Sequence, residues 1–215
     1  PSTTTLSLID KIADSNVFVN YFDMQLQHIT PSMLKIMKRG KGVEKLIELM
    51  DHMKSKPNSF VRTTFIAGHP GETQEDFETL CDYVENYKFD RANVFSYSDE
   101  EGTTAAKSDE KIKQETIDER AGILGEIIAQ TTQESLEKEV GQTFEVYVDG
   151  ESEEHEYLLS ARKTVWAPDI DGEIYINDNE LTDENGEQKQ LEFGKIYTVK
   201  ITELVGDKLL ATVIK

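Results

Sequence analysis

The sequence predicts an α/β fold in two parts: a region of alternating strands and helices over residues 1–140, then a small β-barrel over residues 141–215. Three observations lead to this prediction. A strand pattern at 60–67 runs through a glycine loop into an amphipathic helix. Strand and helix patterns keep alternating up to about residue 138. Beyond residue 141, short strand patterns are separated by turn residues, which is typical of a small antiparallel barrel.

The stretch at residues 60–77 is central to the first part. Residues 60–67 are β-branched and aromatic, and this run is long enough for one strand but short for a helix. Gly68 and Gly71 flank Pro70 in a loop where the backbone can approach a ligand closely, because glycine has no Cβ. Thr73 is a natural N-cap for the helix that follows. The apolar stripe of that helix is Phe77, Leu80, Cys81 and Val84.

The other elements of the first part follow from the same patterns. We expect helices at residues 2–13, 30–39, 43–54 and 109–138, and strands at 17–26 and 89–97, with a polar loop at 98–108. The 17–26 strand is expected to be buried, and Pro31 is expected at the first position of its helix. The alternation predicts a parallel sheet covered by helices.

The second part contains five short strand patterns. These are residues 143–148, 156–161, 173–176, 195–201 and 208–213. Glycine, proline and Asn-Gly or Asp-Gly pairs separate them, so we predict a five-stranded antiparallel barrel.

The composition limits the classes of protein to which this chain can belong. The chain has 215 residues, 37% of them hydrophobic, and no apolar run approaches the roughly 18 residues of a membrane helix. Its single cysteine excludes an internal disulfide, fits a reducing cytoplasm, and excludes an all-cysteine metal site built from this stretch alone. The chain starts at Pro1, so we expect that its natural N-terminus is missing.

Charge is the strongest compositional signal. The chain has 42 acidic and 23 basic residues, a net charge of −19, and residues 143–215 alone carry −10. Such a surface repels phosphate backbones and attracts basic partners. Barrels that bind nucleic acid need a basic groove with aromatic residues, which this one lacks, so we do not expect a nucleic acid partner. Solubility alone is the alternative explanation for the charge.

Several stretches together resemble the methylthiotransferases of the radical S-adenosylmethionine (SAM) superfamily. They are residues 21–29 (YFDMQLQHI), 34–40 (LKIMKRG), 62–77 (RTTFIAGHPGETQEDF), 89–91 (FDR) and 94–103 (VFSYSDEEGT). The second part, with residues 167–172 (APDIDG), resembles the TRAM domain that ends these proteins. Gln25 departs from the family, in which we expect proline.

The resemblance implies that residues 1–140 form the C-terminal half of a radical SAM α/β barrel with a linker helix, followed by a five-stranded, OB-like TRAM barrel. It also implies SAM and two 4Fe-4S clusters as cofactors of the full-length protein. The family holds its clusters with a CxxxCxxC motif and three further cysteines, which do not occur here. We therefore expect no cluster, no metal ligand, no catalytic residue and no turnover in this chain, and we interpret Cys81 as a core residue.

Candidate cofactor residues follow from the position of ligands in α/β barrels, at the carboxyl ends of the strands. That rule selects residues 27–28, 68–72 and 95–97, and the family analogy places residues 66–72 near the adenine of the cofactor. We name six candidate residues: Gln27, His28, Ala67, Gly68, Gly71 and Phe95. The alternative is that they only form tight turns. Arg62 is expected to meet a carboxylate, either of the protein or of the methionine part of the cofactor.

Within the family, the chain is most similar to the branch that methylthiolates an aspartate of a basic small-subunit ribosomal protein in the cytoplasm. The acidic TRAM domain would recognise that protein. The alternatives are the branch that modifies a tRNA adenosine, which the −10 charge disfavours, and a non-catalytic acidic adaptor for basic ribosomal proteins. A barrel cut in half also predicts self-association through its open sheet edge.

Overall fold

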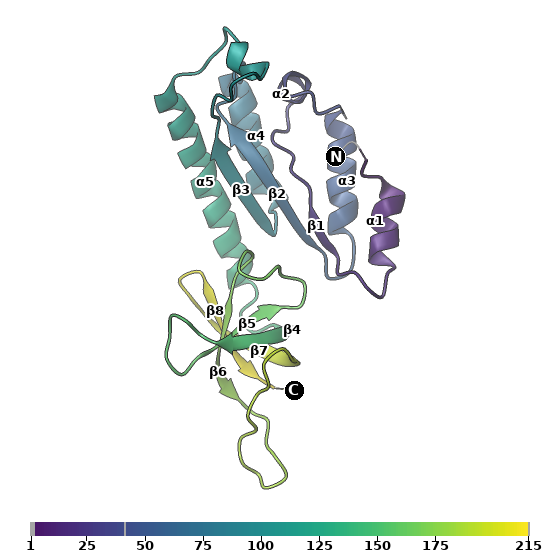
Figure 1. The fold of residues 1–215 in the computed structure, drawn as a ribbon, viewed down its shortest axis with the longest axis vertical. Helices are drawn as coiled ribbons and strands as arrows, with labels where there is room; N and C mark the ends of the chain where they lie inside the picture. Colours follow the sequence, from purple (N-terminus) through teal and green to yellow (C-terminus); the bar gives the residue numbers. More distant parts are fainter. Residues whose placement is uncertain (1–2, 41, 215) are drawn as a thin grey trace. The chain divides into compact units, whose positions relative to one another are not determined.

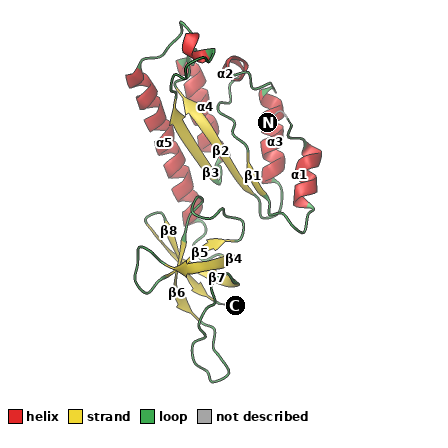
Figure 2. Ribbon diagram, in the orientation of Figure 1, coloured by secondary structure: helices red, strands yellow, loops and turns green. Residues whose placement is uncertain are grey.

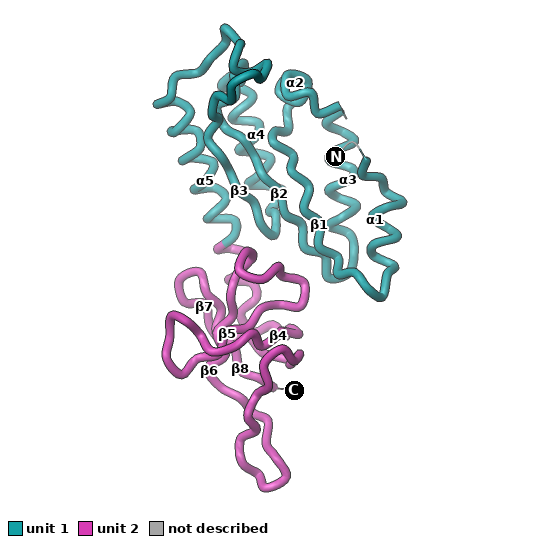
Figure 3. The backbone as a smooth tube through the Cα atoms, in the orientation of Figure 1, with its two compact units in different colours: residues 1–132 teal, residues 133–215 magenta. Residues whose placement is uncertain are grey.

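The computed structural model describes residues 3–40 and 42–214. Its contacts divide the chain into two compact units, residues 1–132 and 133–215 (Figure 3). The division falls inside the long helix α5 (Gln114–Glu137), whereas the change in composition predicts a boundary after residue 140. No helix in the described part of the chain combines the length and apolarity needed to cross a bilayer.

Unit 1 contains a three-stranded parallel sheet in the order β1-β2-β3 (Figure 1). The strands are β1 (Tyr21–Asp23), β2 (Phe60–Ala67) and β3 (Arg91–Ser96). Tyr21 pairs with Phe60, and Arg62 pairs with Arg91. Parallel strands need crossover connections, and helices supply these connections between β1, β2 and β3. This arrangement confirms the predicted partial α/β barrel.

The helices of unit 1 are α1 (Leu6–Ala13), α2 (Pro31–Ile36), α3 (Val43–Lys54), α4 (Gln74–Tyr87), the short 3-10 helix η1 (Ala105–Lys107) and the first part of α5 (Figure 2). Pro31 starts α2, where its missing N–H costs nothing. Apolar faces of α3 and α4 pack with β2 into one core, in which Leu46, Phe65 and Leu80 are fully buried.

The strand predicted at residues 17–26 is wrong in extent. Within this range only Tyr21–Asp23 forms a strand, and its first residue, Tyr21, pairs with Phe60 at the start of β2. Val17 and Phe18, expected to be buried, are exposed, with 85% and 66% of their surface accessible. Met24 and Leu26 are buried as expected. A β-branched and aromatic run therefore forms a strand here only where a partner strand lies beside it.

Unit 2 is a closed barrel in the order β4-β5-β6-β8-β7. Its strands are β4 (Thr143–Glu151), β5 (Leu159–Lys163), β6 (Ile174–Asn179), β7 (Ile196–Val205) and β8 (Lys208–Val213). Alternate residues point inward, as in β8, where Leu209, Ala211 and Val213 are buried. The five predicted strands are present, but β6 and β8 pair in parallel, so the barrel is mixed rather than antiparallel.

Candidate functional site

A cavity of about 490 Å³ opens at the carboxyl ends of the strands of unit 1. This volume falls within the roughly 300–1,000 Å³ range of small-molecule sites. Its lining residues are Gln25, Gln27, Thr64, Ile66, His69, Phe95, Ser96, Tyr97, Ser98, Glu100, Thr103 and Ala105. The lining thus joins the ends of all three strands with the loop that follows β3.

Gln27 and Phe95, two of the six candidate residues, line this cavity. Gln27 extends the sheet beyond β1: its amide donates to the Thr64 carbonyl at 2.8 Å, and its carbonyl accepts from the Ile66 amide at 2.9 Å. Its φ of 69° redirects the chain away from the sheet. Phe95 leaves 62% of its surface accessible near the end of β3, so its ring is available to a ligand.

Ala67, Gly68 and Gly71 are not among the lining residues; they shape the loop that carries His69. Ala67 is fully buried, and its carbonyl accepts from the Tyr97 amide at 2.9 Å. Gly68 and Gly71 have φ of 80° and 87°, which favour glycine. The assignment of these three residues to cofactor binding stays a prediction.

His28 is fully buried and is not among the residues that line the cavity. Its Nδ1 accepts from the amides of Ile29 at 2.9 Å and Thr30 at 3.2 Å, so the ring proton resides on Nε2. Burial lowers the pKa of His28 to about 4, which keeps the ring neutral near pH 7. Nε2 has no hydrogen-bond partner among the residues that the structure describes.

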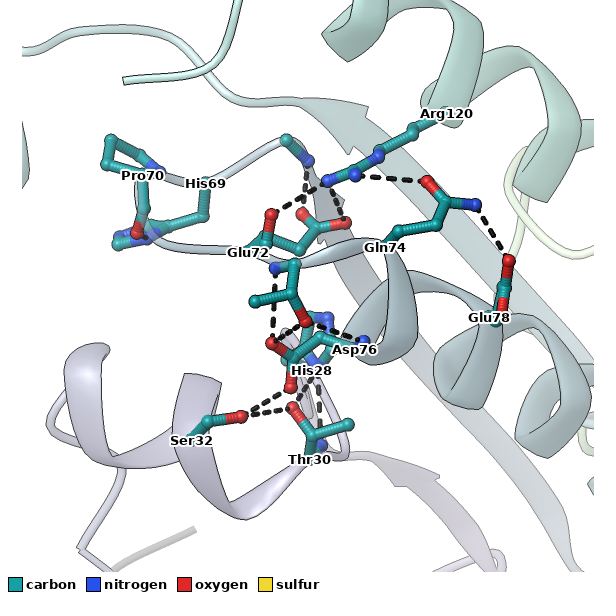
Figure 4. A network of polar contacts seen from close by, with 12 residues as sticks. His28, Thr30, Ser32, His69, Pro70, Glu72, Gln74, Asp76, Glu78 and Arg120 are labelled. Carbon is teal, nitrogen blue, oxygen red and sulfur yellow. Dashed lines mark hydrogen bonds and ion pairs between the residues drawn. The ribbon is translucent and has the colours of Figure 1, made fainter. Parts of the chain in front are cut away.

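A cluster of hydrogen-bonded polar side chains holds the N-terminus of α4, next to the loop of residues 68–72 (Figure 4). Thr73 and Asp76 form a capping box, in which each side chain accepts from the other residue's amide. The Ser32 hydroxyl also donates to the Asp76 carboxylate. Burial by itself would raise the pKa of Asp76, but hydrogen bonds from Ser32, Thr30 and Thr73 outweigh it and bring it to about 2.

The loop between β2 and α4 folds around the buried carboxylate of Glu72 (Figure 4). Glu72 Oε2 accepts from the Gly68 amide at 2.5 Å, and Oε1 lies 3.3 Å from Nη1 of Arg120 on α5. Arg120 also donates to the Glu72 carbonyl at 3.0 Å and to Gln74 Oε1 at 3.2 Å. Burial raises the pKa of Glu72, against the opposing effects of the Gly68 amide and Arg120.

His69 lies in the segment that the strand-end rule selected but was not among the six named candidates, and it lines the cavity. Its Nδ1 lies 2.9 Å from the Pro70 carbonyl, which can only accept, so Nδ1 carries a proton. The ring meets the Tyr97 ring edge to face, with centroids 5.1 Å apart. Its position directly after the strand, between Gly68 and Gly71, was the available signal. Arg120 had none, because its partner Glu72 lies 48 residues away along the chain.

Two further residues concern alternatives that the sequence left open. Arg62 Nη1 lies 3.9 Å from Asp23 Oδ2, so a carboxylate of the protein is available to it. Cys81 is half-buried, and burial together with nearby carboxylates raises the pKa of its thiol to about 11. A lone thiol of this kind does not fit the cysteine set of an iron–sulfur cluster. In the described part of the chain, no three His, Cys, Asp or Glu side chains gather into a metal site.

Comparison with known proteins finds a different family profile in each of the two units. Residues 1–84 match the profile of the radical SAM superfamily, and residues 140–214 match that of the TRAM domain. Proteins named "Ribosomal protein uS12 methylthiotransferase RimO" are similar over the whole chain: 83% identity over 215 residues in Aliarcobacter butzleri and 58% over 215 residues in Sulfurovum sp.. In both, the match covers 100% of this chain and 47% of the relative, so the chain spans about half of their length.

A solved structure shares the fold of part of the chain. The coproporphyrinogen III oxidase HemN from Escherichia coli, a radical SAM enzyme, matches with a TM-score of 0.50. The match covers 61% of this chain and 30% of that protein at 23% identity. At this identity the likeness concerns the fold alone.

Proposed function

We propose that this chain, which belongs to the radical SAM methylthiotransferases of the RimO type, forms the part of such an enzyme that shapes the SAM pocket and docks the protein substrate. The observation that carries the proposal is the 83% identity over all 215 residues to a relative named for uS12 methylthiotransferase activity. The cavity at the carboxyl ends of the parallel strands, where α/β barrels bind ligands, supports it.

The cavity fits SAM by its size and chemistry. Phe95 and Ile66 offer apolar surface for an adenine ring, and Gln27 and Thr64 offer polar groups beside it. When bound, SAM supplies the radical that abstracts hydrogen and the methyl group that is transferred. The residues of this chain bind and orient it and keep water out; the iron–sulfur clusters need cysteines that this chain does not contain.

The proposed substrate is the β carbon of an aspartate in ribosomal protein uS12, modified in the cytoplasm. The barrel would recognise it, because residues 143–215 carry a net charge of −10 and a ribosomal protein is basic. The acidic loop, defined as residues 151–156, comprises the last residue of β4 and the exposed turn after it, and it concentrates this charge in Glu151, Glu153, Glu154 and Glu156. A tRNA substrate would meet the same charge with repulsion.

A binding experiment tests this proposal. The chain is titrated with purified uS12 and, separately, with tRNA at about 50 and 200 mM salt, a range over which charge-driven binding weakens strongly. We expect salt-sensitive binding to uS12 and none to tRNA. Binding to tRNA would move the chain to the tRNA-modifying branch, and failure to bind uS12 would refute the docking role of the barrel.

Turnover separates the enzyme from the alternative of a non-catalytic adaptor. We expect a full-length protein containing this chain, with reconstituted clusters, to add a methylthio group to uS12, detected as a mass increase on one aspartate. Binding of uS12 without this modification would favour the adaptor.

A further inference from the structure

Helix α5 and the segment before it hold the loop of residues 68–72 at three points. The Gly71 amide donates to the Glu110 carbonyl at 3.0 Å. Ile117 packs directly on Gly68, where a Cβ would lie 2.6 Å from Ile117 Cγ1. Arg120 contacts Glu72 through both its carboxylate and its carbonyl. The loop conformation is therefore fixed from outside the loop.

We propose that Arg120 is a positioning residue, which holds Glu72 so that the loop keeps His69 in the wall of the cavity. Arg120 is not among the lining residues, so it would act on the cavity only through this loop. The proposal rests on the proposed function in one respect, namely that SAM is the ligand of the cavity.

The geometry suits arginine in particular. The Arg120 side chain is 9% exposed, and its guanidinium meets three acceptors: the carboxylate and carbonyl of Glu72 and the amide oxygen of Gln74. A planar fork with five donors can serve three acceptors at once, whereas a lysine ammonium is a single point of charge. The side chain of Glu72 is fully buried, so its charge needs both Arg120 and the Gly68 amide as partners.

The link from Glu72 to the cavity is short. The carboxylate accepts from the Gly68 amide, and His69 is the next residue. The His69 ring lies against Tyr97, and both rings line the cavity. A rotation of the Gly68 amide away from Glu72 would therefore move His69 relative to Tyr97, although Arg120 contacts neither ring.

The test compares R120Q and R120K with the control R162Q. Arg162 is a matched control because it also pairs with a carboxylate, Asp149 at 3.2 Å, and donates to a carbonyl, that of Trp166 at 3.2 Å, within unit 2. NMR follows the Gly68 amide and the contacts between the His69 and Tyr97 rings. Isothermal titration measures SAM binding to the same chain.

In R120Q we expect the Gly68 amide to exchange at least about tenfold faster and the His69–Tyr97 contacts to weaken. SAM affinity should fall about tenfold, because the cavity wall is displaced. R120K should recover part of each effect, and R162Q should leave all three unchanged. If R120Q does not fold, R120K carries the test, because lysine keeps the charge but loses the fork.

Unchanged Gly68 exchange and ring contacts in a folded R120Q or R120K, with only a lower melting temperature, would overturn the positioning role. The two proposals fail separately. If the wild-type chain does not bind SAM, this result counts against the proposed ligand, while the Gly68 and ring measurements still decide the role of Arg120.

Discussion

Gly68 and Ile117 approach so closely that a Cβ on Gly68 would lie 2.6 Å from Ile117 Cγ1. Gly68 directly follows the last residue of β2, and Ile117 lies in the first turn of α5, so this contact sets how near the loop lies to the helix. Gly68 also has a φ of 80°. Two independent constraints, backbone conformation and space, therefore require glycine at this position.

The substitution G68A should destabilise unit 1 by about 2–5 kcal/mol, the sum of a left-handed backbone at about 1–2 kcal/mol and overpacking at about 1–3 kcal/mol. The control is G102A, because Gly102 has a φ of 86° with nothing within 4 Å of its Cβ position. Urea denaturation should show only the backbone cost in G102A. In a double-mutant cycle, G68A should cost only the backbone part when it is introduced into I117A, because the clash with Ile117 is then absent. Equal effects of G68A and G102A would contradict the packing argument.

Asp76 should make the stability of unit 1 sensitive to strong acid. Its pKa is lowered from 3.8 to about 2, so the stabilisation is present above pH 4 and is lost as the pH falls toward 2. The loss amounts to about 2 kcal/mol. Chemical denaturation from pH 5 to 2 should show this slope, and D76N should reduce it. D82N, an exposed change on the same helix, should keep it.

His28 should produce a second pH effect in a different window. Its pKa is lowered from 6.5 to about 4, so only the unfolded chain takes up a proton between these values, and stability falls as the pH drops from 6.5 to 4. The expected loss is up to about 3 kcal/mol. H28N should flatten this part of the curve, because an asparagine oxygen can still accept from the amides but does not titrate. H155N, at an exposed histidine, should not; if it did, the assignment to His28 would be wrong.

The acidic loop of the barrel should control association with uS12. Reversing Glu151, Glu153 and Glu156 to lysine should lower the association rate at least about tenfold at low salt and reduce its salt dependence. Glu154 is kept, because it accepts from the Tyr175 hydroxyl at 2.8 Å. The matched control is E75K/E78K/E85K, the same change of charge on exposed positions of α4. Equal effects in stopped-flow measurements would mean that overall charge, rather than this loop, attracts the partner.

Local sequence signals predicted much of the fold. The bounds of α3, β2 and β8 agree with the expected ranges, and Thr73 caps α4 as expected. These elements have a clear hydrophobic period and definite end signals. The parallel pairing of β6 with β8 was missed, because strand-forming residues do not specify which strand will lie beside them.

The sequence predicted where the candidate site lies better than it predicted which residues form it. The rule on strand ends led to the region of the cavity, which Gln27 and Phe95 line, and their assignment to cofactor binding stays a prediction. It did not separate His28, whose Nδ1 faces the next two amides, from Gln27, the residue before it. Nor did it find Arg120, since a charged residue on a long helix resembles a solvent-facing one until its buried partner is known.

Cys81 has a practical consequence for site-specific chemistry. A thiol with a pKa of about 11 is almost entirely protonated at neutral pH, so it reacts slowly with maleimides and iodoacetamide. It is also the only cysteine in the chain. A cysteine introduced at an exposed position such as Glu153 would therefore be labelled selectively. A dye or photocrosslinker attached there could map the docked partner with the native residue left in place.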